Sequence, residues 1–344
     1  MKKVAVYAIT PQGAALGRHL AEQMDADLFL PSSLAEIHGA IPFDGIIELV
    51  KKTFSRYPRH IFIAATGIVI RAIAPHLRSK VKDPAVVALD QHGQYVISLL
   101  SGHLGGANQL AGEVAALSGG TAVITTATDT AGVPSFDLLA EENELTIANL
   151  EAVKTVNMAV LRGEPLQIFD AEDRLGLKNQ DVSAFAVRHI GREEQWDQGS
   201  PGVWVTWKTK DSEPNHLVLH PRSLIAGIGC NRGTQSREIV NLVMRTFRTH
   251  ALALGSLQCL VSIDKKQDEA GLLDAARELG VPLFFFSPSE LADVEVPHPS
   301  NVVKKHLGVS SVCEAAALLK SSGKSLLVPK TKSRNVTLAV GLEG

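Results

Sequence analysis

The chain has 344 residues, about twice the usual length of one domain, so two or three domains with separate cores are expected. Apolar residues make up 45% and charged residues 20%, with a formal net charge of −2, which is typical of an ordinary globular protein. No excess of one charge directs it to nucleic acid or to a membrane surface. The aromatic share of 5% also argues against a stacking platform for single-stranded nucleic acid.

The cysteines indicate a reducing compartment. Cys230, Cys259 and Cys313 are odd in number and far apart, so neither a disulfide framework nor a zinc site of two CxxC pairs is expected. The apolar run at residues 4–9 is too short for a signal peptide, and no apolar stretch reaches the ~20 residues that span a bilayer. We therefore expect a cytoplasmic protein without a membrane segment.

Residues 1–133 predict an amino-terminal α/β domain. Short β-branched runs at 4–9, 61–65 and 123–126 alternate with helical patterns, of which the first covers 13–23, and this indicates a mainly parallel sheet. The runs 86–89 and 95–100 flank a five-residue turn and predict a hairpin. Because a hairpin pairs antiparallel strands, the sheet is predicted to be mixed.

Residues 134–220 predict a small α+β middle domain. It opens with a helix that ends near Arg162-Gly163, where glycine allows a left-handed cap and Pro165 prevents continuation. Strands are expected at 166–169 and 203–207.

Residues 221–344 predict a second α/β domain, with a helix from Ser236 and strands at 224–228, 283–286 and 336–340. The predicted fold class is therefore α/β: two α/β sandwich-type domains with mainly parallel or mixed sheets, joined by the middle domain.

The first segment that could form a functional site is a strand that leads into Thr66-Gly67 and a helical pattern containing Arg71. Unpaired N–H groups at a helix start can bind an anion, and Arg71 and Lys80 would support this. The alternative is a routine strand-to-helix turn with solvated basic side chains.

The second segment runs from Ser98 to Ala111 and gathers a serine, a histidine, an asparagine and three glycines where a strand becomes a helix. Glycines in a helical turn are unfavourable by about 1 kcal/mol each relative to alanine, so a close approach of ligand or backbone is expected. His103 is a candidate general base, and Ser101 or local N–H groups could bind an oxyanion. The alternative is a tightly packed, capped helix with an inert histidine. The candidates are Ser101, Gly102, His103, Gly105, Gly106 and Asn108.

The third segment, Thr125 to Asp129, follows the strand that begins at Val123. Ligands gather beyond the carboxyl ends of parallel strands, so Thr128 and Asp129 are expected in such a place, where Asp129 could orient a water or a histidine. Alternatively, Asp129 caps a helix.

The fourth segment, Gly227 to Gly233, resembles a dinucleotide loop, but its third glycine is one position late and the later acidic residue is missing. A carboxylate or phosphate site with Arg232 remains, lined by Gly229 and Gly233. Cys230 is either a nucleophile or a buried, inert thiol.

The last segments are a helix start containing Glu314 and a basic turn from Pro329 to Thr337 that enters a strand. Lys330, Lys332 and Arg334 could hold carboxylates, and Glu314 could act as a base or as a salt-bridge partner. Solvated surface is the alternative for these charges.

Taken together, these segments resemble the cobalt-precorrin-5A hydrolase family of the anaerobic cobalamin pathway. The resemblance rests on the run from Val87 through Ser101-Gly102-His103-Leu104-Gly105-Gly106-Ala107-Asn108 to Asp129, on Gly227 to Gly233, and on the closing pair near Glu314 and Lys330. It covers nearly the whole chain and is least clear between residues 135 and 220. Asn231 and Cys313 depart from the pattern.

The resemblance implies opening of the δ-lactone of cobalt-precorrin-5A, release of acetaldehyde and formation of cobalt-precorrin-5B. Cobalt would be part of the substrate, so no cofactor and no metal ligand on the protein are implied. We expect His103 as base, Asp129 orienting it, N–H groups near Gly102 or Gly67 as the oxyanion site, and Arg71, Arg232 and Lys330 at the substrate's periphery.

Other interpretations stay open. The chain could be a non-catalytic tetrapyrrole carrier of the same pathway, whereas a nicotinamide-dependent oxidoreductase is disfavoured by the faulty glycine pattern. A homodimer and transient contacts with other enzymes of the pathway are also left open, as is a covalent acyl intermediate on Cys230 or Ser101.

Overall fold

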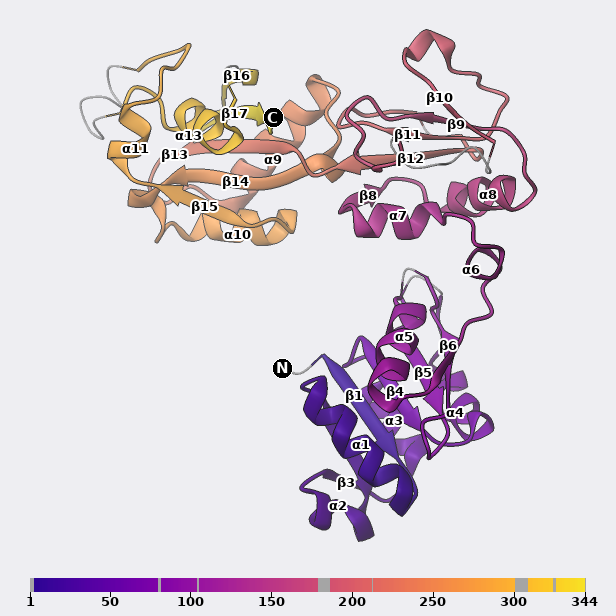
Figure 1. The fold of residues 1–344 in the computed structure, drawn as a ribbon. Coiled ribbons are helices and arrows are strands. Elements are labelled where there is room, and N and C mark those ends of the chain that lie inside the picture. Colours follow the sequence, from indigo (N-terminus) through magenta and orange to yellow (C-terminus); the bar gives the residue numbers. More distant parts are fainter. Residues whose placement is uncertain are drawn as a thin grey trace. The chain divides into compact units, whose positions relative to one another are not determined.

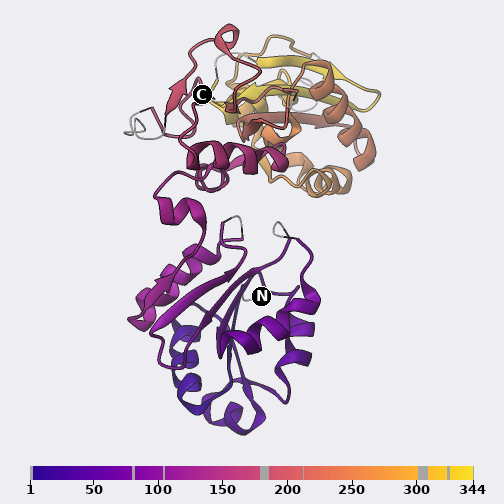
Figure 2. The ribbon, with the colours of Figure 1, turned by 90° about the vertical axis from the view of Figure 1, so that its right-hand side faces the viewer.

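The structure is a computed structural model that describes residues 3–79, 82–103, 105–178, 186–211, 213–300, 309–323 and 326–343 (Figures 1 and 2). The chain divides into two compact units, Met1–Leu138 and Leu139–Gly344. The finer division predicted at 133/134 and 220/221 stays a prediction. None of the described helices is long and apolar enough to cross a membrane.

The first unit is built on a seven-stranded sheet of order β3-β2-β1-β4-β5-β6-β7. The strands are β1 (Val4–Ala8), β2 (Asp27–Pro31), β3 (Ile41–Phe43), β4 (Arg59–Ile63), β5 (Ala85–Leu89), β6 (Tyr95–Leu100) and β7 (Thr121–Val123). Strands β1 to β5 are parallel, whereas β6 pairs antiparallel with β5 and parallel with β7. The predicted hairpin and mixed sheet are therefore confirmed.

Helices cover both faces of this sheet, as Figure 2 shows. They are α1 (Pro11–Gln23), α2 (Ser32–His38), α3 (Ile46–Thr53), α4 (Thr66–Ile73) and α5 (Ala107–Ser118), with a 3-10 turn η1 (Ala74–His76) after α4. Two short helices, α6 (Ala127–Ala131) and α7 (Phe136–Glu142), follow β7 along the chain, and α7 crosses the boundary between the two units. Side chains of β1 alternate between the faces: Val4 and Val6 pack with α1 and α5, and Ala5 and Tyr7 pack with α3 and α4. A strand buried on both faces explains its continuous apolar sequence.

The second unit begins with a five-stranded sheet of order β10-β9-β11-β12-β8. Its elements are β8 (Leu145–Ile147), α8 (Leu150–Leu161), β9 (Leu166–Phe169), β10 (Val187–His189), η3 (Glu193–Gln195), β11 (Gly202–Val205) and β12 (His216–Pro221). The single helix expected up to Arg162 is wrong, because β8 interrupts it by pairing antiparallel with β12. Gly163 has φ of +66°, which fits the predicted left-handed end of α8.

A second five-stranded sheet, of order β15-β14-β13-β17-β16, completes this unit. Its elements are β13 (Leu224–Cys230), α9 (Ser236–Thr249), η4 (Leu254–Ser256), β14 (Leu257–Ile263), η5 (Asp264–Lys266), α10 (Ala270–Leu279), β15 (Leu283–Phe286), α11 (Pro288–Ala292), α13 (Val312–Ser321), β16 (Leu326–Lys332) and β17 (Val336–Leu342). Helices α9 and α10 pack on one face, and α11 and α13 on the other. The α/β fold class is thus confirmed.

One predicted turn is in fact a strand. Residues Pro329 to Lys332 belong to β16, which pairs antiparallel with β17, so the basic segment is one arm of a hairpin. Charged residues obscured the strand pattern there.

Candidate active site

His103 lies between two carboxylates in the first unit. Its Nε2 is 2.9 Å from Oδ2 of Asp129, and its Nδ1 is 3.4 Å from Oδ2 of Asp137. The Asp129 side chain is 29% exposed, whereas that of Asp137 is 6% exposed, so one carboxylate faces outward and the other is buried. The predicted pair of His103 and Asp129 is therefore in contact, and Asp137 is a third member that the sequence reasoning missed.

Further donors hold the outer carboxylate in place. Asn108 Nδ2 donates to Oδ2 of Asp129 at 3.1 Å and to Oγ1 of Thr126 at 2.9 Å, and Thr126 Oγ1 donates to the same carboxylate oxygen. Oγ1 of Thr128 lies 3.0 Å from Nε2 of His103. Oδ1 of Asn108 also accepts a bond from Ser98 of β6, so these contacts fasten the start of α5 both to β6 and to α6.

The two carboxylates set the protonation of the site. The carboxylate of Asp137 contributes most to raising the pKa of His103, burial of the ring opposes it, and Asp129 adds to the rise. For Asp129, burial favours the neutral acid, but bonds from Thr126 and His103 outweigh it and lower the pKa of the carboxyl. These contacts therefore favour the protonated ring and the ionised Asp129 carboxylate more than in the free side chains.

The glycines around His103 allow a tight loop before α5. A Cβ on Gly105 would lie 2.2 Å from Cβ of Ser101, and Gly106 has φ of +78° at the N-cap of α5. Both glycines precede α5 rather than lie within it, and the close approach is to backbone and side chain of the same loop. A Cβ on Gly102 would lie 2.8 Å from Oδ1 of Asn108.

Ser101 supports this loop. It adopts φ of +59°, and its hydroxyl donates to the backbone carbonyl of Asp83 at 3.0 Å. The proton of the Ser101 hydroxyl is thus engaged, and a role as nucleophile or oxyanion donor stays a prediction that requires this bond to open.

The sheet separates two groups that the sequence analysis treated as one. His103 follows β6 and Asp129 follows β7, and both strands run against β4, so these residues lie at the edge where β4 and β5 begin. Thr66, Gly67 and Arg71 follow β4 and lie at the opposite edge. Asp129 is thus beyond the carboxyl end of its own strand but not beside the ends of the parallel strands, because the hairpin reverses direction.

At that opposite edge, the guanidinium of Arg71 donates to the carbonyl of Gly67 at 2.9 Å. An oxyanion site at Gly67 would therefore be separate from His103, and only Gly102 remains beside the histidine. Lys80 is outside the described residues.

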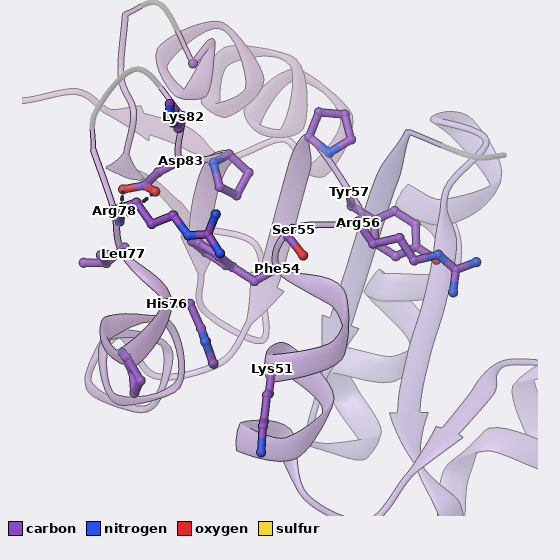
Figure 3. Close-up of a pocket in the computed structure, with 14 residues that line it drawn as sticks. Lys51, Phe54, Ser55, Arg56, Tyr57, His76, Leu77, Arg78, Lys82 and Asp83 are labelled. Carbon is purple, nitrogen blue, oxygen red and sulfur yellow. Dashed lines mark hydrogen bonds between the residues drawn. The ribbon is translucent and has the colours of Figure 1, made fainter.

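A cavity of ≈ 620 Å³ opens on the same edge as His103 (Figure 3). It is lined by residues of two segments, 51–58 and 75–84, and by Gly105 from the His103 loop.

In the second unit, four of the predicted residues line a cavity of ≈ 510 Å³: Gly229, Cys230, Lys330 and Lys332. Arg334 lines it too. A Cβ on Gly229 would lie 2.6 Å from Oγ1 of Thr337, so this glycine permits close packing of β13 against β17. Burial raises the pKa of the Cys230 thiol, which disfavours the thiolate. Cys313, the departure noted in the sequence, is buried beneath β13 in the core.

Arg232 and Gly233 have internal partners instead. Arg232 pairs with Asp268 at 2.6 Å and donates to the carbonyl of Lys265, and the N–H of Gly233 donates to Glu269 at 2.7 Å. These bonds tie the loop after β13 to the segment that precedes α10.

Glu314 is fully buried, and its carboxylate joins two segments. It accepts from Nδ1 of His298 at 2.8 Å, from the N–H of His298 at 3.1 Å and from the N–H of Lys330 at 3.2 Å. Nζ of Lys330 in turn donates to the carbonyl of His298. This arrangement corresponds to the predicted alternative of a salt-bridge partner, with His298 as the cation when it is protonated.

Three protein-family models match successive regions of the chain. Family models described as the N-terminal, central and C-terminal regions of cobalamin synthesis protein G match residues 48–129, 134–221 and 224–341. They define a multi-region protein of cobalamin biosynthesis.

A protein of Salmonella typhimurium named cobalt-precorrin-5A hydrolase is 35% identical over 99% of this chain and 98% of its own length. One of Priestia megaterium with the same name is 33% identical over 98% and 94%. The chain belongs to the cobalt-precorrin-5A hydrolase family. A solved cobalamin biosynthesis protein G homologue from Sulfolobus solfataricus is 20% identical over 100% of this chain and 98% of its own, with a TM-score of 0.39.

Proposed function

We propose that the chain hydrolyses cobalt-precorrin-5A, opens its δ-lactone and releases acetaldehyde to give cobalt-precorrin-5B. The observation that carries this proposal is the His103 ring held between Asp129 and Asp137 beside an open cavity, in a chain whose full-length relatives carry that name.

The reaction needs one water and no oxidant. The water oxygen adds to the lactone carbonyl, and the bond between the acyl carbon and the ring oxygen breaks to leave a carboxylate and an alkoxide. The alkoxide collapses to acetaldehyde, and the electron pair of its bond to the macrocycle passes to the ring carbon, which takes a proton. Acyl transfer of this kind requires a base for water and donors for the oxyanion.

His103 and Asp129 act in this proposal as one acid–base pair, and Asp137 is a positioning residue. In the neutral form, Nδ1–H of His103 donates to the buried Asp137, which fixes the ring as the buried aspartate does in a Ser-His-Asp triad. Nε2 and Oδ2 of Asp129 are then two acceptors 2.9 Å apart without a proton between them. The 2.9 Å separation leaves no room for a water between these two atoms, so the Asp129 side chain must turn away from the neutral ring before a water binds. That water donates an O–H to Nε2, which takes the proton during attack.

The second unit has a cationic cavity of its own, lined by Lys330, Lys332 and Arg334, whose side chains suit the binding of carboxylates. Cobalt arrives in the substrate, coordinated by its ring, so the protein needs no cofactor for the steps above.

The test is acetaldehyde release from cobalt-precorrin-5A by the wild type and by His103→Ala, Asp129→Asn and a control, His19→Ala, which removes an exposed histidine of α1. We expect a loss of about 10²–10⁴ in kcat for His103→Ala, the usual contribution of a general base, and none for the control. In water labelled with oxygen-18, the label should appear in the new acetate group.

Two outcomes contradict the proposal. Unchanged release by His103→Ala would exclude this base. Binding of the intermediate by the wild type without aldehyde would favour the non-catalytic carrier instead.

A further inference from the structure

The cavity beside His103 has an excess of positive charge. The described lining contains four cationic side chains, those of Lys51, Arg56, Arg78 and Lys82, and one carboxylate, that of Asp83. That carboxylate is 8% exposed, and both of its oxygens accept from the backbone N–H of Arg78, at 2.9 and 3.1 Å. The side chains of Arg78 and Lys82 are thus not neutralised by it, and they are exposed.

The side chains of this lining differ in direction. Figure 3 shows the side chain of Arg78 reaching toward the segment of Phe54 and Ser55. Arg56 points the other way and lies over the ring of Tyr57, with 5.4 Å from its guanidinium carbon to the ring centroid. Arg78 is therefore the cation best placed to meet a ligand in the cavity, and the apolar side chain of Phe54 forms part of the wall beside it.

The cavity and the His103 loop share a wall. Gly105 of the loop lines the cavity, and the Ser101 hydroxyl donates to the carbonyl of Asp83, the residue whose carboxylate holds Arg78. Gly105 also packs so closely on Ser101 that a Cβ there would overlap it. A ligand anchored at Arg78 consequently lies against the loop that carries His103.

We infer that this cavity is the subsite that holds carboxylate side chains of the macrocycle next to the reacting lactone, with Arg78 and Lys82 as its cationic anchors. The inference rests on the proposed function. A guanidinium binds a carboxylate through two parallel N–H bonds, and an ammonium adds a point charge. A cavity of ≈ 620 Å³ falls in the range of about 300–1,000 Å³ that suits a small ligand, so it holds one edge of the macrocycle with its carboxylate arms.

The first experiment measures kcat and KM for Arg78→Ala, Lys82→Ala, Arg78→Lys and a control, Arg18→Ala, in the full chain. Arg18 carries the same charge on α1, where it pairs with Glu22 on the surface. We expect KM to rise about tenfold for Arg78→Ala, as for one lost charged contact, and kcat to change less than about twofold. Lys82→Ala should have a smaller effect, Arg78→Lys should restore part of the loss, and Arg18→Ala should match the wild type.

The second experiment measures binding without turnover, by absorbance titration of a porphyrin with eight carboxylates and one with four. The wild type should bind the first more tightly, and added salt should weaken binding less in Arg78→Ala than in the wild type. Equal dissociation constants for wild type, Arg78→Ala and Arg18→Ala overturn the inference. Because this titration requires no aldehyde release, a failed proposed function and a failed subsite give different results.

Discussion

Nδ1 of His103 lies 3.4 Å from the buried carboxylate of Asp137, on the side of the ring opposite Asp129. Asp137 contributes most to the raised pKa of His103, and the more exposed Asp129 lies at the other ring nitrogen.

Asp137→Asn should shift the pH dependence of the reaction. In the proposed mechanism the active form has a neutral His103, so kcat should rise with pH through the pKa of His103, which lies above the ~6.5 of a free histidine because Asp137 and Asp129 raise it. Removing the charge of Asp137 lowers that pKa, so the midpoint of the kcat profile moves to lower pH. A residue that only stabilised the fold would lower kcat equally at every pH, and that result would contradict the assignment.

Gly105→Ala should impair catalysis while the protein stays folded. The new Cβ meets Ser101 at 2.2 Å, so the loop that carries His103 must move, and we expect kcat to fall at least tenfold. The matched control is Gly112→Ala on the exposed side of α5, where a Cβ meets nothing within 4 Å. That change should raise the free energy of unfolding by about 0.5–1 kcal/mol and leave kcat unchanged, since glycine is unfavourable within a helix. Equal kcat for both variants would show that the loop tolerates the shift.

The same residues show which parts of the site could be predicted from the sequence. The hairpin of β5 and β6 and the glycine loop could be predicted, because turn chemistry is a local signal. The pairing of His103 with Asp129, 26 residues apart in sequence, could be predicted from two separate polar clusters together with the family resemblance. The position of Asp129 relative to the parallel strands could not, since it depends on which way β7 runs in the sheet. Asp137 gave no signal beyond an acidic residue in the first turn of a helix, which usually complements the helix dipole.

Strand direction also decides which cations lie near His103. Arg71 and Lys80 are close in sequence to Thr66 and Gly67, but strand direction places Arg71 at the edge opposite His103. Arg78 and Lys82 precede β5, and the antiparallel pairing of β5 with β6 brings that segment beside the loop after β6. Closeness in sequence therefore does not show which cations lie beside a given strand end in the fold.

Glu314→Gln should separate a structural from a catalytic role. The carboxylate oxygens accept three bonds from His298 and Lys330, and the amide of glutamine keeps one acceptor for them. We expect kcat within about threefold of the wild type for Glu314→Gln. Glu314→Ala should reduce the free energy of unfolding by about 2–4 kcal/mol, because buried donors lose their partner. If Glu314→Gln abolished aldehyde release while its unfolding was unchanged, Glu314 would be the base instead.

His60 should make the stability of the first unit depend on pH. The ring is fully buried beside Tyr7, and burial lowers the pKa of His60 to about 4, although bonds to the carbonyls of Phe54 and Tyr57 oppose the shift. The unfolded chain then binds a proton that the folded chain does not between about pH 6.5 and 4, so stability falls as pH falls through this window. We expect the free energy of unfolding, measured with urea at each pH, to be lower by about 3 kcal/mol near pH 4 than at neutral pH. His60→Gln should make the free energy of unfolding less dependent on pH in this window. An unchanged slope in the variant would assign the pH dependence to other groups.

Cys230 should prove dispensable if water attacks the lactone directly. Its side chain lines the cavity of the second unit, but burial raises the pKa of the thiol, so little thiolate is present at neutral pH. Cys230→Ser should keep kcat within about twofold of the wild type, and iodoacetamide should modify Cys230 more slowly than free cysteine at pH 7.5, measured by mass spectrometry. An acyl adduct on Cys230 during turnover, together with loss of activity in Cys230→Ser, would instead establish a covalent route and move the site of acyl transfer from His103 to the second unit.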